Sequence, residues 1–121
     1  MDAVTYSDSR TVEFINRFMI PCRANTQSFG NLAGSYGIQY TPTVLTLDGD
    51  GREHNRTEGF LDAKEFIPSL MLGVGKTDFS NKLVKRAIAM IDMLLIEYPM
   101  SRVVSDATRL KQEWLKQQTG K

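Results

Sequence analysis

The sequence predicts an α/β protein, with a mixed sheet flanked by helices and then a C-terminal hairpin of two helices. Before residue 75, segments with helical spacing alternate with short apolar runs, which is typical of helices packed on a sheet. After residue 76, apolar residues recur only at helical spacing. We therefore divide the chain into residues 1–75 and 76–121, with Gly73 and Gly75 as a glycine hinge between them.

The first predicted helix covers residues 9–18. Ser7 and Asp8 are residue types that cap helix N-termini, and the apolar residues after them recur near the helical period. Pro21 stops this helix, and the short apolar segment at residues 20–24 predicts a strand after it.

A second helix is predicted at residues 27–36, because its apolar residues share one face. Gly37 follows at the point where a helix C-terminus needs positive φ. Gly30 and Gly34 within the segment weaken the helix.

A β-hairpin is predicted next. The β-branched apolar run at residues 44–47 stops at the turn Asp48-Gly49-Asp50-Gly51, so that residues 53–58 can pair back as an antiparallel strand. Asp62 then caps a helix that Gly73 closes, with Pro68 as an interior kink.

The C-terminal hairpin consists of two amphipathic helices. Apolar residues share a face over residues 79–98, Pro99 interrupts the pattern, and a second apolar face follows over residues 103–114. This pair is similar to one helix-turn-helix unit of the tetratricopeptide type. Such a unit does not normally stand alone, so we expect it to cap the sheet domain or to pair with another chain.

Composition excludes several classes of partner. The chain has 121 residues, with 15 basic and 14 acidic side chains and a single His, which gives no electrostatic reason to expect nucleic acid or an anionic membrane. No apolar run approaches the roughly 18 residues of a membrane span. We expect a soluble chain without a cofactor, with the cytoplasm favoured.

The order of motifs around Tyr40-Thr41-Pro42-Thr43 resembles the thioredoxin-like family. This segment follows a helix ended by glycine and precedes an apolar strand, a Gly-rich turn, a second strand and a helix. The resemblance covers residues 1–75 and implies that Pro42 forms a cis peptide bond in a loop that binds substrate. Tyr40, Thr41 and Pro42 are thus the candidate site, where backbone hydrogen bonds would hold an extended protein or peptide partner.

The departure from the family concerns the redox centre. The family places a strand and a Cys-x-x-Cys motif just before the segment at which this chain begins, whereas Cys22 is the only cysteine here. Exchange chemistry needs a low-pKa thiolate with a resolving cysteine. Because Cys22 follows Pro21 within a predicted strand, we interpret it as a buried, inert thiol.

Without that first strand, the two strands beside it would expose backbone edges in the middle of the sheet. They could pair directly, a second copy could cover them in a homodimer, or the chain could be a shortened form of a longer protein. We favour the shortened form, and we expect its exposed apolar surface to promote self-association.

Other motifs resemble functional sites only in part. The segment Gly73-Val-Gly-Lys-Thr77 resembles the end of a phosphate-binding loop, but it follows a helix instead of a strand. Asp48-Gly-Asp-Gly51 lacks the remaining ligands of a calcium loop, and His54 has no metal-ligand partners at the usual spacing, so we expect it to face solvent. No metal or catalytic residue is assigned.

Three functions are consistent with the sequence. The first is a thioredoxin-like domain that lacks a redox centre and binds a protein partner. The second is a fragment of a thiol-disulfide oxidoreductase whose Cys-x-x-Cys lies upstream of Met1, which the encoding frame would reveal. The third is an oligomerisation or scaffold module that acts through the C-terminal hairpin.

Overall fold

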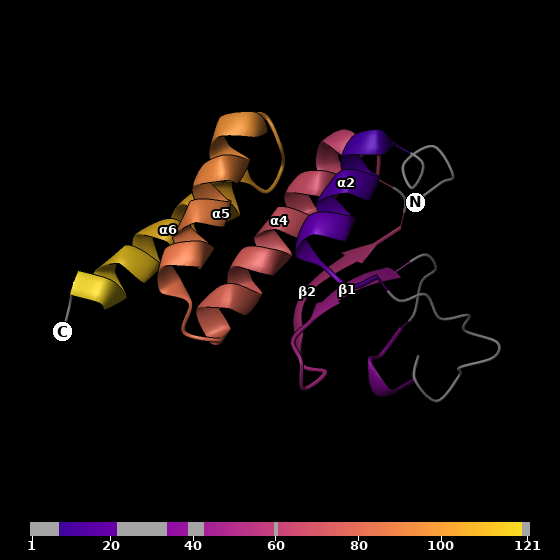
Figure 1. The fold of residues 1–121 in the computed structure, drawn as a ribbon, viewed down its shortest axis with the longest axis horizontal. Coiled ribbons are helices and arrows are strands. Elements are labelled where there is room, and N and C mark those ends of the chain that lie inside the picture. The colour runs from indigo at the N-terminus through magenta and orange to yellow at the C-terminus, as the bar shows by residue number, and fades with distance from the viewer. Residues whose placement is uncertain (1–7, 22–33, 39–42, 60, 120–121) are drawn as a thin grey trace.

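The computed structural model describes residues 8–21, 34–38, 43–59 and 61–119. These residues form α2 (Ser9–Phe18), β1 (Thr43–Leu47), β2 (Glu53–Glu58), α4 (Ala63–Ser80), α5 (Val84–Glu97) and α6 (Val104–Thr119). The protein is therefore a mixed helix and strand structure with α4 at its centre. Figure 1 shows the two strands on one side of α4 and the helices α5 and α6 on the other.

Helix α2 forms over the residues that the sequence predicted. The Asp8 carboxylate accepts a hydrogen bond from the Arg10 backbone N–H and so caps the helix. Helix α2 contacts α4, and its buried Phe14 belongs to the same core as the apolar residues of α4. The strand predicted at residues 20–24 is not formed at Ile20 and Pro21, where Ile20 is almost fully exposed; residues 22–24 lie outside the described residues.

Strands β1 and β2 form the predicted hairpin. Within the described residues they make an antiparallel two-stranded sheet, so the mixed sheet that we predicted is not observed there. Thr46 is paired with Asn55 and Val44 with Thr57, and this face of the sheet packs on α4. Side chains alternate between the two faces of a strand, so Arg56 belongs to the opposite face.

The segment 34–38 lies against that opposite face. Gly34 and Ser35 are helical, and Gly37 has the positive φ of +64° expected at the end of a helix. The rest of the helix predicted at residues 27–36 lies outside the described residues. Hydrogen bonds from Arg56 to Tyr36 and Gly37 join the segment to β2. The hairpin therefore has α4 on one face and residues 34–38 on the other.

Helix α4 is longer than predicted. Asp62 caps its N-terminus as expected, by accepting a hydrogen bond from the Glu65 N–H, but the helix continues through Gly73 and Gly75 to Ser80. The glycine hinge predicted there is therefore wrong. Residues 66–75 are all buried, because the sheet, α2 and α5 surround this part of the helix. The division that we placed after residue 75 falls inside α4.

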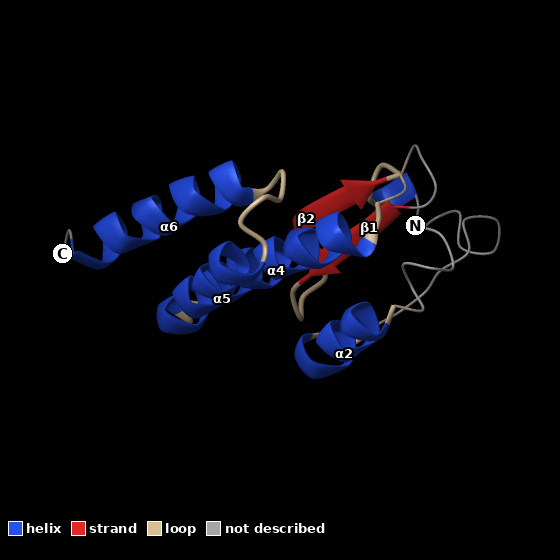
Figure 2. Ribbon diagram, turned by 90° about the horizontal axis from the view of Figure 1, so that it is seen from above, coloured by secondary structure: helices blue, strands red, loops and turns tan. Residues whose placement is uncertain are grey.

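The two C-terminal helices are confirmed with shifted boundaries. Phe79 belongs to the last turn of α4, and a turn at residues 81–83 separates it from α5, which we had expected to include it. Helix α6 lies along α5 (Figure 2), and its Trp114 ring stacks on Phe79 with centroids 4.8 Å apart. Helices α4, α5 and α6 therefore share one core.

The turn between α4 and α5 contains a strained residue. Lys82 has φ of 66°, a left-handed conformation in which a side chain is unfavourable. We expect Lys82→Gly to raise the free energy of unfolding by about 0.5–1 kcal/mol in urea titrations. Ala89→Gly on the exposed face of α5 should instead lower it by about 1 kcal/mol. A loss of stability in Lys82→Gly would show that the turn is not strained.

Candidate functional site

The predicted binding loop lies between two described segments. Tyr40, Thr41 and Pro42 are outside the described residues, as is Cys22, so the structure does not place these candidate residues. It does place the two ends of the loop. Residues 34–38 precede it, and β1 begins directly after it at Thr43. The contacts of these two flanking segments are described next.

Arg56 holds the segment that enters the loop. Its Nη1 donates to the Gly37 carbonyl oxygen at 3.3 Å, and its Nη2 donates to the Tyr36 carbonyl oxygen. The guanidinium is also bonded to both carboxylate oxygens of Glu53, at 2.8 and 2.9 Å, and to Glu58 at 3.5 Å. Hydrogen bonding to Arg56 lowers the pKa of Glu53, and the same bond raises that of Arg56. The two carboxylates thus orient the guanidinium towards the two carbonyl groups.

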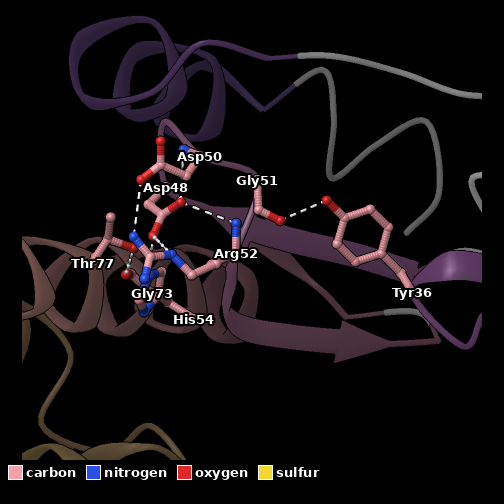
Figure 3. A network of polar contacts seen from close by, with 8 residues as sticks. All are labelled: Tyr36, Asp48, Asp50, Gly51, Arg52, His54, Gly73 and Thr77. Atoms are coloured by element: carbon pink, nitrogen blue, oxygen red, sulfur yellow. Dashed lines mark hydrogen bonds and ion pairs between the residues drawn. The ribbon is translucent and has the colours of Figure 1, made fainter.

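Tyr36 provides a second attachment. Its hydroxyl donates to the Gly51 carbonyl oxygen at 2.6 Å, which joins the segment to the turn of the hairpin (Figure 3). Gly51 has φ of +83°, and a Cβ there would lie 3.3 Å from the Tyr36 hydroxyl oxygen. Glycine is therefore favoured at residue 51 by both its backbone conformation and this close approach. We refer to Tyr36, Gly37, Gly51 and Arg56, with Glu53 and Glu58, as the loop anchor.

Asp48 organises the turn itself. One carboxylate oxygen accepts hydrogen bonds from the backbone N–H groups of Asp50 and Arg52, at 2.9 and 3.0 Å. The other lies 2.9 Å from His54 Nε2 and 3.3 Å from Arg52 Nε (Figure 3). The hydrogen bond with His54, followed by the one with the Arg52 backbone, lowers the pKa of Asp48 to about 2. The DGDG motif is thus a hairpin turn whose first carboxylate is fully used by the protein.

His54 is not the solvent-facing residue that we predicted. Its side chain retains 16% of its accessible surface and pairs with Asp48, whose side chain retains 3%. The sequence missed this pair because the two residues belong to opposite ends of the turn. Among the described residues, no group of three or more His, Asp or Glu side chains could hold a metal ion.

The Asp48 contacts predict an acid-sensitive turn. A carboxyl whose pKa is depressed by folding stabilises the protein above its ordinary pKa of 3.8, and this contribution is lost as the pH falls towards 2. We expect Asp48→Asn to reduce the free energy of unfolding most above pH 4, with the difference from the wild type shrinking towards pH 2. Urea titrations across this range test it. Asp50→Asn, at an exposed position in the same turn, is the control and should lower the free energy of unfolding less than Asp48→Asn does.

The other motifs have structural roles in the interface between the sheet and α4. The Lys76 Nζ donates to the Asn55 Oδ1 at 3.1 Å, and the Thr77 hydroxyl donates to the Gly73 carbonyl oxygen at 2.8 Å. The Asn55 amide donates in turn to the Ser69 carbonyl oxygen at 3.0 Å. The segment resembling a phosphate-binding loop is therefore helical, and its lysine bonds an asparagine of β2.

Comparisons of the chain with protein-family models, curated proteins and solved structures find no match. None of the helices in the described part of the chain has both the length and the apolar character needed to cross a bilayer.

Sequence reasoning missed the loop anchor. Tyr36 and Arg56 are separated by 20 residues in the chain, and no spacing rule relates an arginine on a strand to the carbonyl groups of an earlier turn. The only local signal was the placement of Glu53 and Glu58 on either side of Arg56. The Tyr36 hydroxyl and the Arg56 guanidinium are already hydrogen-bonded within the protein.

Proposed function

We propose that the protein is a thioredoxin-like domain without a redox centre that binds a protein partner at the loop Tyr40-Thr41-Pro42. The order of the described elements supports this proposal, because a glycine-ended turn, a strand, a Gly-rich turn, a second strand and a helix follow one another as the resemblance implies. Helices α2 and α4 pack together, and α4 covers one face of the hairpin.

The observation that carries the proposal is the attachment of the segments on both sides of the loop. Residues 36 and 37 are bonded to β2 and to the hairpin turn, and residue 43 is already part of β1. The hairpin is itself packed on the central helix. Binding residues commonly lie on loops whose flanking segments belong to a rigid scaffold, and these two flanking segments meet that condition.

The cysteine content argues against redox chemistry within these residues. Cys22 is the single cysteine of the 121 residues, so the chain has no second thiol to resolve a mixed disulfide. In an insulin-reduction assay with dithiothreitol, turnover should not exceed that of dithiothreitol alone. Catalytic reduction would contradict the proposal and favour an oxidoreductase.

Selection of displayed random peptides on the immobilised protein would test the binding function. Peptides recovered with the wild type should bind the variants Tyr40→Ala and Pro42→Ala about tenfold more weakly or worse, which corresponds to about 1.4 kcal/mol. Arg109→Ala, at an exposed position of α6, is the matched control and should bind normally. Peptides that bind all four proteins equally would contradict the proposed site.

A second candidate function is assembly through the C-terminal helices. Ile96 and Met100, which lie near the turn between α5 and α6, are 79% and 92% exposed. Exposed apolar side chains of this size favour self-association. Light scattering at high protein concentration should then show a homodimer or larger species that Ile96→Gln with Met100→Gln abolishes. A monomer at all concentrations would exclude this function.

A further inference from the structure

Basic side chains gather at the end of the molecule where α4 is followed by α5 and where α6 ends. Figures 1 and 2 show the turn between α4 and α5 at the same end of the structure as the last turn of α6. The stacking of Trp114 on Phe79 joins the two parts there. We refer to six exposed residues as the basic end: Lys82, Leu83, Lys85, Arg86, Leu115 and Lys116.

The positive charge of the basic end is compensated only in part. Neither residues 79–91 nor residues 114–119 include an acidic side chain. Arg86 Nε lies 4.0 Å from the largely buried Asp78 carboxylate, whereas the lysines of residues 79–91 form no ion pair with a described acidic residue. The chain as a whole has 15 basic and 14 acidic side chains. The local excess therefore arises because the fold brings two basic segments to the same end.

The start of α5 adds to this potential. Its first turn has no acidic residue, and no side chain caps its N-terminus. The partial positive charge of the helix end is therefore not offset by a carboxylate of the same turn. Two leucines, Leu83 and Leu115, are each 40% exposed, and each has a lysine next to it in the chain. The basic end thus presents small apolar areas beside positive charges.

This combination favours a protein partner over a nucleic acid or a lipid surface. Single-stranded nucleic acids stack their bases on accessible aromatic rings, but Phe79 and Trp114 stack on each other and Trp114 is buried. Binding in a lipid interface needs a broad apolar face beside the charges, and the two leucines expose too little surface for one. Apolar contacts with charged residues around them are the usual composition of a protein interface.

We infer that the basic end binds an acidic segment of a partner protein that carries both carboxylates and apolar side chains. The carboxylates pair with the lysines of the basic end, and an apolar side chain of the segment covers Leu83. Complementary charge selects the partner and speeds its association, while burial of the leucine adds affinity. The proposed function concerns residues 40–42, and Ile96 and Met100 lie at the other end of α5, so the inference depends on neither.

Fluorescence anisotropy of labelled peptides tests the inference with the full chain. The probe is a peptide in which one leucine follows every two glutamates, and the reference peptide has glutamine in place of each glutamate. At low ionic strength the wild type should bind the glutamate peptide at least about tenfold more tightly than the glutamine peptide. Added salt should reduce this difference, because exposed charges are screened. Equal affinity for the two peptides would contradict the inference.

Two variants with the same net charge locate the binding surface. The test variant combines Lys82→Gln, Lys85→Gln and Lys116→Gln, and the control variant combines Lys64→Gln, Arg102→Gln and Arg109→Gln, at exposed positions away from the basic end. The test variant should bind the glutamate peptide about tenfold more weakly or worse, and the control variant should bind it as the wild type does. An equal loss in both variants would mean that only net charge matters, and would overturn the inference.

Two further probes address the other classes of partner. One is a single-stranded oligonucleotide, and the other is a vesicle that contains phosphatidylserine. The wild type should bind both more weakly than the glutamate peptide. Tighter binding to either probe, with a loss in the test variant alone, would assign the basic end to that partner and overturn the inference.

Discussion

Replacement of Trp114 by alanine should lower the free energy of unfolding by about 3–5 kcal/mol, the usual cost of removing a buried large aromatic side chain. Trp114 on α6 is 3% exposed and stacks on Phe79 in the last turn of α4, with an interplanar angle of 12°. The substitution therefore removes buried apolar surface, leaves a cavity and breaks the stacking contact between the two helices. Urea unfolding followed by far-ultraviolet circular dichroism measures the loss.

Two variants control for other effects of the substitution. Trp114→Phe preserves an aromatic ring at the same position and should lose less stability than the alanine variant. Leu115→Ala, at the adjacent and 40% exposed residue, should cost about 1 kcal/mol or less. If Trp114→Ala and Leu115→Ala were equally stable, the contact between α6 and α4 would not contribute to folding, and the C-terminal helices would be an independent appendage.

The elements predicted correctly are those specified by neighbouring residues. The hairpin follows from a β-branched apolar run that ends at an Asp/Gly turn, and the starts of α2 and α4 follow from Asp8 and Asp62, whose side chains accept hydrogen bonds from the first turns. Each of these signals lies within eight consecutive residues or fewer. Such signals can be recognised without knowledge of the tertiary structure.

The end of α4 was predicted incorrectly because a glycine can either end a helix or lie inside one where a neighbouring element packs closely. A glycine after an apolar helical run commonly marks the helix end, and this was the basis for closing the helix at Gly73. Here tertiary packing determines the outcome, since a helix buried on several sides needs small residues where its neighbours approach its backbone. Which glycines serve this purpose depends on the position of the sheet and of α5, and the sequence pattern does not contain that information.

The candidate site could also be predicted from the sequence only in part. The motif around Pro42 identified a loop from consecutive residues, whereas the anchor joins Tyr36, Gly51 and Arg56 across the folded hairpin. The pairing of His54 with Asp48 likewise depends on the geometry of the turn. Contacts of this kind become visible only when the register of the strands and the path of the preceding segment are known.

Gly73→Ala tests the close packing of α4 directly. A Cβ at residue 73 would lie 2.5 Å from Thr46 Oγ1, 2.9 Å from Thr46 Cβ and 3.1 Å from Asn55 Cβ, so the sheet would have to move away from the helix. Overpacking of this kind costs about 1–3 kcal/mol, and the shift would also strain the hydrogen bonds of Asn55 to Ser69 and Lys76. We expect the clash to outweigh the gain of about 1 kcal/mol that alanine brings to a helix interior.

Gly75→Ala is the matched control, because it makes the same chemical change two residues later on a different side of α4. The nearest atom to its Cβ is Ile91 Cδ1 at 3.1 Å, the terminal methyl group of a buried side chain, so a shift of this methyl group by a few tenths of an ångström would relieve the contact without moving the sheet. The helix-propensity gain should offset the small repacking cost, so its free energy of unfolding should stay within about 1 kcal/mol of the wild type. Urea titrations of the two variants decide the matter. A hinge at these glycines would make both substitutions behave alike, whereas close packing against the sheet makes Gly73→Ala the more destabilising of the two.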